Sequence, residues 1–354
     1  MKIVFLGGNF NNSGGTERVA SVIANELSRS GHEVVLASMV EGNTPFFPLE
    51  SKVSIVSVLN GAGRILYRVP SLIRGIRRLL IEEKADVLIV VESMSVLYTA
   101  PATVGLPIKH ICWEHFNYNI DLGQKGRRLA RHMAAWLCDV VVTLTEQDKE
   151  YWLKHTRHRA QITTIPNPSP FPVKNVSLNT ESKVVLAAGR LTYQKGFDLL
   201  LLAWKKVNNS YPDWKLHIVG DGEDKNALEN SAAEYGISGS VEFVGNKQDM
   251  EKYYQKSAIY CLSSRFEGFG MVLVEAMSYG LPIVSFNCEL GPSEILSGTD
   301  SRLIPVGDTD ELANSLIELM ADEKERERLS RQSEVKAKQY QPDKIIGQWL
   351  EVIV

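Results

Sequence analysis

The feature of this sequence that most constrains its fold is the alternation of strand and helix patterns, which occurs in two successive runs separated by a proline-rich segment. Short apolar runs typical of buried parallel strands alternate with segments whose apolar residues recur at helical spacing. This order predicts parallel, doubly wound sheets, whose ligands bind beyond the carboxyl ends of the strands. We therefore expect an α/β fold with one such sheet in each half of the chain.

The expected elements can be placed by residue number. In the first half, strands are predicted at 2–6, 34–38, 53–58, 87–91, 108–113 and 140–144, and helices at 15–28 and around 125–137. In the second half, strands are predicted at 183–188, 215–219, 241–244, 258–262 and 282–286. Helices are predicted there at 197–208, 224–235, 249–255, 271–277, 311–320 and 321–338.

The proline-rich segment Ile165–Pro170 marks the domain boundary. Its three prolines remove backbone N–H donors and fix φ, which makes a stiff linker. A chain of 354 residues is also long for a single hydrophobic core. We expect a first domain over residues 1–168 and a second domain over residues 169–339.

Charge and hydropathy limit the compartment and the partners. Residues 1–170 contain 19 basic and 15 acidic side chains, whereas residues 171–354 contain 20 and 27. A basic first half fits an anionic acceptor or membrane surface, and no nucleic-acid motif accompanies it. The N-terminal apolar run is too short for a signal peptide, and no stretch is apolar enough to span a bilayer. We expect a cytoplasmic protein whose four cysteines are buried thiols.

The segment Ser263–Gly280 has the pattern of an anion-binding site. A predicted buried strand leads into a glycine-punctuated turn with Glu267, Gly268 and Gly270, and then into the helix at 271–277. The first N–H groups of a helix lack internal partners and carry partial positive charge. A carboxylate would repel a phosphate there, so Glu267 and Glu275 are better acceptors for hydroxyls. Together these features predict a pocket for a sugar nucleotide.

Three motifs resemble those of one family, the family-4 retaining glycosyltransferases of the GT-B fold. The first is the spacing of Glu267 and Glu275, with seven residues between them. The second is G-R-L-T-Y-Q-K-G at Gly189–Gly196, and the third is the glycine loop G-G-T-E-R at Gly14–Arg18. They occur in the order and at the spacing of the family, which makes their combination specific.

The resemblance implies two Rossmann-like domains that face each other across a cleft. A C-terminal helix, residues 340–354 here, would cross back to the first domain, which would bind the acceptor. The second domain would bind a nucleoside-diphosphate sugar and transfer its hexose or N-acetylhexosamine with retention of configuration. No metal or other cofactor would be required. The segment Asn287–Glu294 resembles a subgroup that uses UDP-sugars, although Glu294 can instead cap its own helix.

The resemblance also assigns the donor site. Arg190 and Lys195 would hold the diphosphate, together with backbone N–H groups at Phe269, Gly270 and Met271 beside Gly268. Fixed cations and helix N-termini stabilise charge that develops on such a leaving group. Glu267 would hold sugar hydroxyls and Glu275 the ribose. Backbone at Asn246 would contact the nucleobase.

Residues of the first half complete the predicted site. Gly14 and Gly15 precede a helix, where backbone can approach a donor or acceptor phosphate; the alternative is a simple turn, with Glu17 and Arg18 on the surface. His115 ends a strand where the family often has a histidine near the transferred sugar and the acceptor. The alternative for His115 is a packing role, and Glu114 beside it has no clear assignment. The predicted catalytic residues are therefore Glu267, Arg190, Lys195 and His115.

Two basic segments suggest peripheral attachment to the inner face of the plasma membrane. One spans residues 64–84 and contains Arg64, Arg68, Arg74, Arg77 and Arg78; the other spans residues 125–131 and contains Lys125, Arg127 and Arg128. A basic amphipathic helix can lie on an anionic membrane, but the same pattern fits a solvated helix face. Many relatives use lipid-linked acceptors, and this favours the membrane.

We therefore predict transfer from a UDP-sugar to a polyprenyl-diphosphate-linked glycan in bacterial surface polysaccharide synthesis. The D-x-D at Asp308–Asp310 resembles a metal motif, but it precedes a helix that acidic residues would cap. Two other functions remain open. One is a GT-B sugar-nucleotide epimerase, and the other is a catalytically silent scaffold that binds nucleotide sugars.

Overall fold

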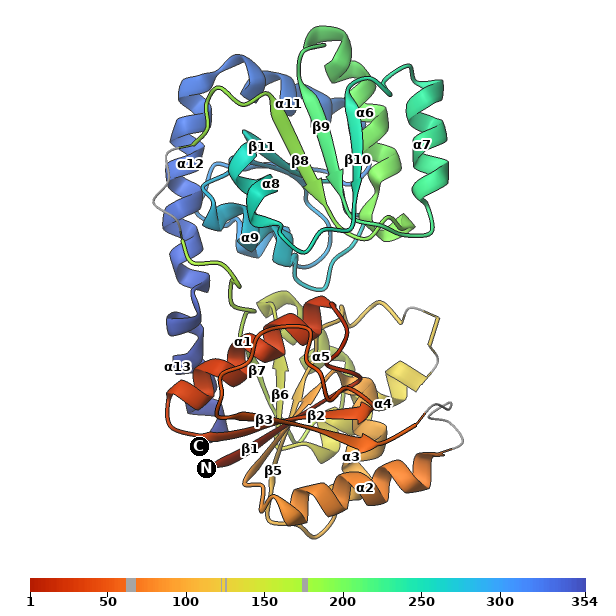
Figure 1. Ribbon diagram of the computed structural model, residues 1–354, viewed down its shortest axis with the longest axis vertical. Coiled ribbons are helices and arrows are strands. Elements are labelled where there is room, and N and C mark those ends of the chain that lie inside the picture. Colours follow the sequence, from red (N-terminus) through yellow and green to blue (C-terminus); the bar gives the residue numbers. More distant parts are fainter. Residues whose placement is uncertain (62–67, 122, 125, 174–177) are drawn as a thin grey trace. The chain divides into compact units, whose positions relative to one another are not determined.

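The computed structural model describes residues 1–61, 68–121, 123–124, 126–173 and 178–354. Over these residues the chain forms two compact units (Figure 1). The first unit consists of Met1–Pro170 and Pro342–Val354, and the second of Phe171–Gln341. The boundaries expected at residues 168 and 339 lie close to these. Arg64 and Lys125 of the expected basic segments lie outside the described residues.

The first unit contains a seven-stranded parallel sheet in the order β3-β2-β1-β4-β5-β6-β7. Its strands are β1 Lys2–Gly7, β2 Glu33–Val40, β3 Val53–Leu59, β4 Val87–Val91, β5 Lys109–Trp113, β6 Val140–Thr143 and β7 Gln161–Thr164. Its helices are α1 Gly15–Arg29, α2 Val69–Glu82, α3 Val96–Thr103, α4 Gly126–Leu137, α5 Glu146–His155 and α13 Pro342–Ile353. The order of the strands reverses between β1 and β4.

The second unit contains a six-stranded parallel sheet in the order β10-β9-β8-β11-β12-β13. Its strands are β8 Val184–Ala188, β9 Lys215–Val219, β10 Val241–Gly245, β11 Ile259–Leu262, β12 Ile283–Phe286 and β13 Arg302–Ile304. Its helices are α6 Phe197–Ser210, α7 Lys225–Glu234, α8 Glu251–Lys256, α9 Met271–Ser278, α10 Pro292–Ile295, α11 Thr309–Ala321 and α12 Glu323–Ala337. Both units are thus doubly wound, as predicted, and in this sheet the order reverses between β8 and β11.

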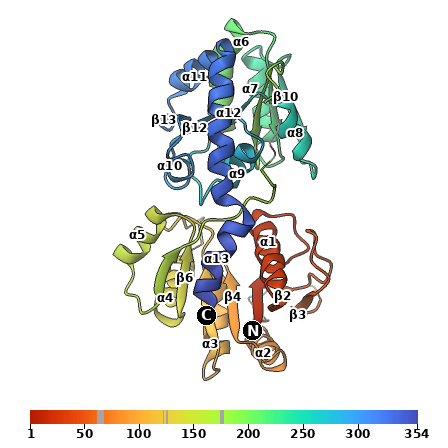
Figure 2. The same cartoon turned by 90° about the vertical axis from the view of Figure 1, so that its left-hand side faces the viewer.

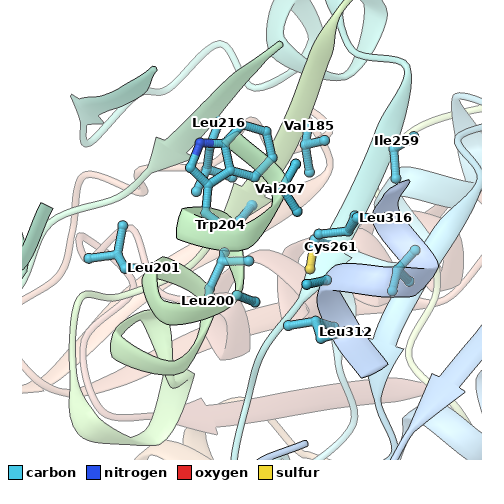
Figure 3. Packing of buried hydrophobic residues seen from close by; sticks show 14 of the residues in the cluster. Val185, Leu200, Leu201, Trp204, Val207, Leu216, Ile259, Cys261, Leu312 and Leu316 are labelled. Carbon is cyan, nitrogen blue, oxygen red and sulfur yellow. The ribbon is translucent and has the colours of Figure 1, made fainter. Parts of the chain in front are cut away.

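The core of the second unit holds the strands whose ends form the candidate site. Figure 3 shows Trp204 of α6 among Val185, Leu216 and Val207, all of them fully buried. The indole N–H of Trp204 donates a hydrogen bond to Ser240 Oγ at 3.1 Å, so burial leaves this donor satisfied. Each buried aliphatic side chain contributes about 1.5–3 kcal/mol. Val185 of β8 and Ile259 of β11 belong to this same buried cluster.

The C-terminal helix α13 belongs to the first unit, which confirms the predicted return of the chain (Figure 2). It packs beside α1, and Trp349 is fully buried. The Trp349 ring lies edge-on to Trp113, with ring centroids 4.8 Å apart. Ile353 is also buried, whereas Leu350 and Val352 are only partly buried. Ile345 is buried as well, so three side chains spaced four residues apart hold the helix by one face.

Other local predictions can be checked against the structure. The side chain of Asp308 accepts a hydrogen bond from Glu311 N at 3.0 Å, so it caps α11 as expected. All four cysteines are free and buried, and burial raises the pKa of the Cys261 thiol to about 12. Among the described helices, none combines the length and apolar content needed to cross a bilayer.

Candidate functional site

The loops that follow β8 and β11 meet at the carboxyl end of the second sheet. These two strands are neighbours at the point where the strand order reverses, and doubly wound sheets bind their ligands there. Ser263 Oγ donates to Lys195 O at 2.9 Å, and Arg265 N donates to Gln194 O at 2.8 Å. Gln194 Nε2 donates to Phe266 O at 3.0 Å. Hydrogen bonds therefore join the two loops into one surface.

Lys195 and Glu267 form an ion pair within this surface. Lys195 Nζ lies 2.6 Å from Glu267 Oε1, and Ser264 Oγ donates to the same oxygen at 2.6 Å. The Lys195 side chain is 17% exposed and that of Glu267 is 6% exposed. An ammonium group has three N–H donors, so pairing with one carboxylate oxygen leaves two donors for another anion. The pair fixes both side chains at the reversal point of the sheet.

Gly196 allows the first loop to approach the second. Its φ is 61°, in the left-handed region that glycine adopts most easily. A Cβ at this position would lie 2.1 Å from Ser263 O, far inside van der Waals contact. The close approach that brings Lys195 to Glu267 therefore requires glycine here.

Arg265 serves as a support for the same loops. Its guanidinium binds both carboxylate oxygens of Asp198, at 2.8 and 2.6 Å, and lies over the Tyr193 ring at 4.1 Å. The hydrogen bond from Arg265 holds the pKa of the Asp198 carboxyl below its usual value. This arginine is thus engaged within the scaffold. Arg190, in contrast, is exposed and forms no ion pair with any residue that the structure describes.

Helix α9 begins at the same edge of the sheet without a side-chain cap. Its N-cap residue, Gly270, has a φ of 102°, and Gly268 and Phe269 precede it. Gly291 packs against this turn so closely that a Cβ would lie 1.7 Å from Phe269 O. Backbone N–H groups at the start of a helix favour anions. The turn therefore has the geometry expected of an anion-binding helix start.

Glu275 and Asn246 differ in burial and in how they are held. Glu275 is 6% exposed and accepts a hydrogen bond from Tyr254 OH at 2.7 Å. The Tyr254 ring stacks on Tyr279 with centroids 5.3 Å apart. Asn246 is exposed and follows β10, the edge strand, two strands away from β8. Glu275 is thus buried and hydrogen-bonded, whereas Asn246 is an exposed residue that follows the edge strand of the same sheet.

The glycine loop of the first unit has an acidic neighbour. Gly14 is the N-cap of α1 and has no side-chain cap. A Cβ at Gly14 would lie 2.2 Å from Glu17 Oε2, and Thr16 Oγ1 donates to that same oxygen at 2.8 Å. The Glu17 carboxylate thus lies at the helix start, beside Gly15. An incoming phosphate would require this carboxylate to move.

His115 is nearly buried after β5. Its ring lies 4.5 Å from that of Trp113, and burial lowers its pKa to about 3, so the imidazole is neutral at pH 7. Its Nε2 atom has no hydrogen-bond partner among the described residues. Glu114 accepts hydrogen bonds from Ser93 Oγ at 2.5 Å and from Arg131 Nε at 3.3 Å. Glu114 is therefore engaged internally, whereas His115 retains an unsatisfied nitrogen.

The pair Glu92–Arg127 was not predicted from the sequence. Arg127 Nη2 lies 2.8 Å from Glu92 Oε1, and the Arg127 side chain is 2% exposed, so this arginine does not belong to a solvated basic face. Glu92 directly follows β4, where the strand order reverses, and has a φ of 90°. Burial raises the pKa of the Glu92 carboxyl. A non-glycine residue with positive φ at a strand end is the kind of strain found at functional sites.

The basic face expected on α2 is only partly free. Arg77 Nη1 donates to Ala102 O at 2.9 Å and to Val104 O at 2.8 Å, which ties it to the end of α3. Arg68 binds carbonyl oxygens of the preceding loop. Arg74 and Arg78 are exposed. Two arginines of this helix thus remain available on its outer face. No group of three or more potential metal ligands occurs within the described ranges.

Comparison with known proteins shows the family. Residues 13–169 match the family model "Glycosyltransferase Family 4", and residues 172–336 match "Glycosyl transferases group 1". An uncharacterized glycosyltransferase of Haemophilus influenzae is 36% identical and covers 99% of both chains. AmsD of Erwinia amylovora, an amylovoran biosynthesis glycosyltransferase, is 32% identical over 99% of both chains.

A solved structure agrees in fold. Anabaena HepE in complex with UDP and glucose superposes with a TM-score of 0.83 at 19% identity, covering 100% of this chain and 99% of that one. At this identity the likeness concerns the fold alone. Because two glycosyltransferase family models match consecutive parts of the chain and full-length relatives exceed 30% identity, this chain belongs to the family-4 glycosyltransferases of the GT-B fold.

Proposed function

We propose that this protein transfers a hexose or N-acetylhexosamine, with retention of configuration, from a UDP-sugar to a glycan on polyprenyl diphosphate in bacterial surface polysaccharide synthesis. The amylovoran relative supports the pathway class. A Campylobacter jejuni relative, 28% identical over 100% of this chain and 98% of its own, is an N-acetylgalactosaminyltransferase named for an acceptor on PP-undecaprenol. HepE, which shares the fold, was crystallised with UDP and glucose.

The observation that carries the proposal is the junction of the loops after β8 and β11. Lys195 and Glu267 lie 2.6 Å apart there, in the loops that lead into α6 and α9. Cleavage at the anomeric carbon leaves negative charge on the diphosphate. Arg190, the remaining donors of Lys195 and the N–H groups at 269–271 would stabilise that charge. With these cations in place, the reaction would need no metal ion.

The two carboxylates would orient the rest of the donor. Glu267 has one oxygen bound by Lys195 and Ser264 and would accept from sugar hydroxyls with its other oxygen. Glu275 is held by Tyr254 and would accept from the ribose. A carboxylate oxygen has more than one acceptor site, so these internal bonds still allow a ligand hydroxyl. Backbone near Asn246 would contact the base only if the uracil reached the β10 edge.

The first unit would bind the acceptor. His115 is neutral and has an unsatisfied Nε2, so it would act through a hydrogen bond to a hydroxyl. The loop at Gly14 and Gly15 would contact a phosphate only after Glu17 moved away. We further propose a cytoplasmic location at the membrane, where anionic lipids would attract the basic first unit.

Incubation with a panel of labelled sugar nucleotides and bacterial membrane extract tests the function. Transfer of label into lipid supports the proposal, and NMR of the product linkage reports whether configuration is retained. Release of a free epimer would instead identify a sugar-nucleotide epimerase. Binding of a nucleotide sugar without turnover of any donor would identify a silent scaffold.

A further inference from the structure

One surface of the first unit combines exposed apolar side chains with basic ones. Leu129, Trp136 and Leu137 of α4 are 58%, 43% and 52% exposed. Leu129 and Trp136 are seven residues apart, so they lie on the same face of the helix. Large apolar side chains at this exposure, gathered on one helix face, indicate a surface that meets an apolar phase or a partner. We call it the α4–α5 surface, because α5 and the loop after it complete it.

A depression next to Trp136 gives this surface its basic character. It has a volume of about 640 Å³ and is lined by His132, Trp136, Lys154, His155, Thr156 and Arg157. None of these six side chains is a carboxylate. Arg159 lies beside the depression, with its guanidinium 4.0 Å from the centre of the Trp136 ring. No ion pair joins Lys154, Arg157 or Arg159 to another residue in the described part of the chain.

The loop that carries Arg157 and Arg159 is hydrogen-bonded to α4. The N–H groups of Arg159 and Ala160 both donate to Ala135 O, at 2.8 and 3.1 Å. Thr156 Oγ1 donates to Trp152 O at 2.7 Å, which closes the end of α5. The basic residues are therefore presented on a fixed frame beside the apolar face of α4.

We infer that the α4–α5 surface docks on an anionic phospholipid bilayer. Tryptophan prefers the interface of a membrane, and leucines at the edge of a helix enter the acyl boundary. Lysine and arginine beside them bind lipid phosphates. Complementarity of charge selects this occupant over a neutral apolar partner. The inference rests on the proposed function, because an acceptor on a polyprenyl lipid is presented at a membrane.

Helix α2, the face expected from the sequence, is less suited to this role. It exposes Arg74 and Arg78, but Arg77 is bound to carbonyl oxygens of α3 and the loop after it. Ile81, 53% exposed, is its one large apolar side chain that is exposed within the described residues. Electrostatic attraction with a single apolar anchor gives weaker and more salt-sensitive attachment. The two helices therefore provide matched test and control surfaces in one unit.

Cosedimentation of the full-length protein with vesicles tests the inference. Vesicles of phosphatidylglycerol and phosphatidylcholine are compared with vesicles of phosphatidylcholine alone. Each cation near an anionic surface contributes roughly fivefold to partitioning, so Arg157→Gln with Arg159→Gln should reduce binding about 25-fold. The control, Arg74→Gln with Arg78→Gln, should reduce it far less. Equal losses in the two double variants, or wild-type binding that does not depend on the anionic lipid, would overturn the assignment.

A second measurement reports insertion directly. The native cysteines are buried, so a dye sensitive to polarity can be attached to Leu137→Cys, with Ile81→Cys as the control. On anionic vesicles the dye at 137 should shift to the blue, and the dye at 81 should not. A shift at 81 alone would transfer the docking face to α2. Binding of UDP in detergent, measured on the same variants, should stay at the wild-type level; vesicle binding without any glycosyl transfer would refute the proposed function and leave this inference standing.

Discussion

Breaking the Lys195–Glu267 pair should destabilise the second unit through the carboxylate that is left behind. The Glu267 side chain is 6% exposed and receives hydrogen bonds from Lys195 and Ser264, both at 2.6 Å. Replacing Lys195 by methionine keeps the length of the side chain and removes the charge. Removing one partner of a buried ion pair costs about 3–5 kcal/mol. Because Lys195 is 17% exposed and water can reach its place, we expect the lower end, about 3 kcal/mol.

The double variant separates this effect from general damage to the loop. In Lys195→Met with Glu267→Gln no buried charge remains unpaired. The free energy of unfolding of this double variant should therefore be about 2–3 kcal/mol higher than the value obtained by adding the losses of the two single variants. Urea denaturation of the four proteins measures this coupling. The exposed pair Lys206–Asp310 of the same unit, 2.9 Å apart, is the matched control, and its coupling should stay below about 1 kcal/mol. Strict additivity for Lys195 and Glu267 would refute the reasoning.

Glycosyl transfer should behave differently from stability in this cycle. Removal of one charge-stabilising donor typically costs about 10²–10³ in rate. If Lys195 also holds the diphosphate, the double variant should regain stability and still lack activity. Recovery of transfer together with stability would contradict the donor-site roles assigned to Lys195 and Glu267.

Three further predictions concern local features. Gly196→Ala should lower the free energy of unfolding, measured in urea, by more than the about 1–3 kcal/mol that backbone strain at positive φ costs, because the new Cβ would also lie 2.1 Å from Ser263 O. An unchanged free energy of unfolding would contradict the loop geometry. Burial raises the pKa of Asp148 to about 7, so between pH 4 and 7 the native state holds a proton that the unfolded state has released. The free energy of unfolding should therefore fall as pH rises from 4 to 7. Asp148→Asn should flatten this pH dependence in thermal melts, and an unchanged dependence would exclude Asp148 as its source. EDTA should leave transfer unchanged, and strong inhibition would reopen a metal role for Asp308 and Asp310.

The elements around the candidate site were predictable because their signals are local. The apolar run before Ser263 and the glycines before Met271 predict a strand, a turn and a helix, and β11 and α9 follow this order. The strands β7 and β13 were missed. Their sequences, Q-I-T-T and R-L-I, are short, and edge strands need little apolar surface. Helix α5 was also missed, although Thr145 caps it by accepting from Asp148 N at 3.1 Å.

Pairings between distant residues were not predictable from the sequence. The contact of Lys195 with Glu267 depends on β8 and β11 being neighbours, which is a property of strand order and not of either motif. The Glu92–Arg127 pair likewise joins the end of β4 to α4, and Arg127 had been placed with the surface cations. Sequence periodicity predicts which residues are buried only when they are apolar. A buried arginine has no such signal.

The central claim is that the loops after β8 and β11, with the start of α9, hold the diphosphate of the donor. A crystal structure of the protein with a UDP-sugar tests it most directly. We predict diphosphate oxygens about 2.7–3.1 Å from Lys195 Nζ, Arg190 and the N–H groups at 269–271, with Glu267 against a sugar hydroxyl. A donor bound elsewhere, with Lys195 and Glu267 contacting only each other, would contradict the account.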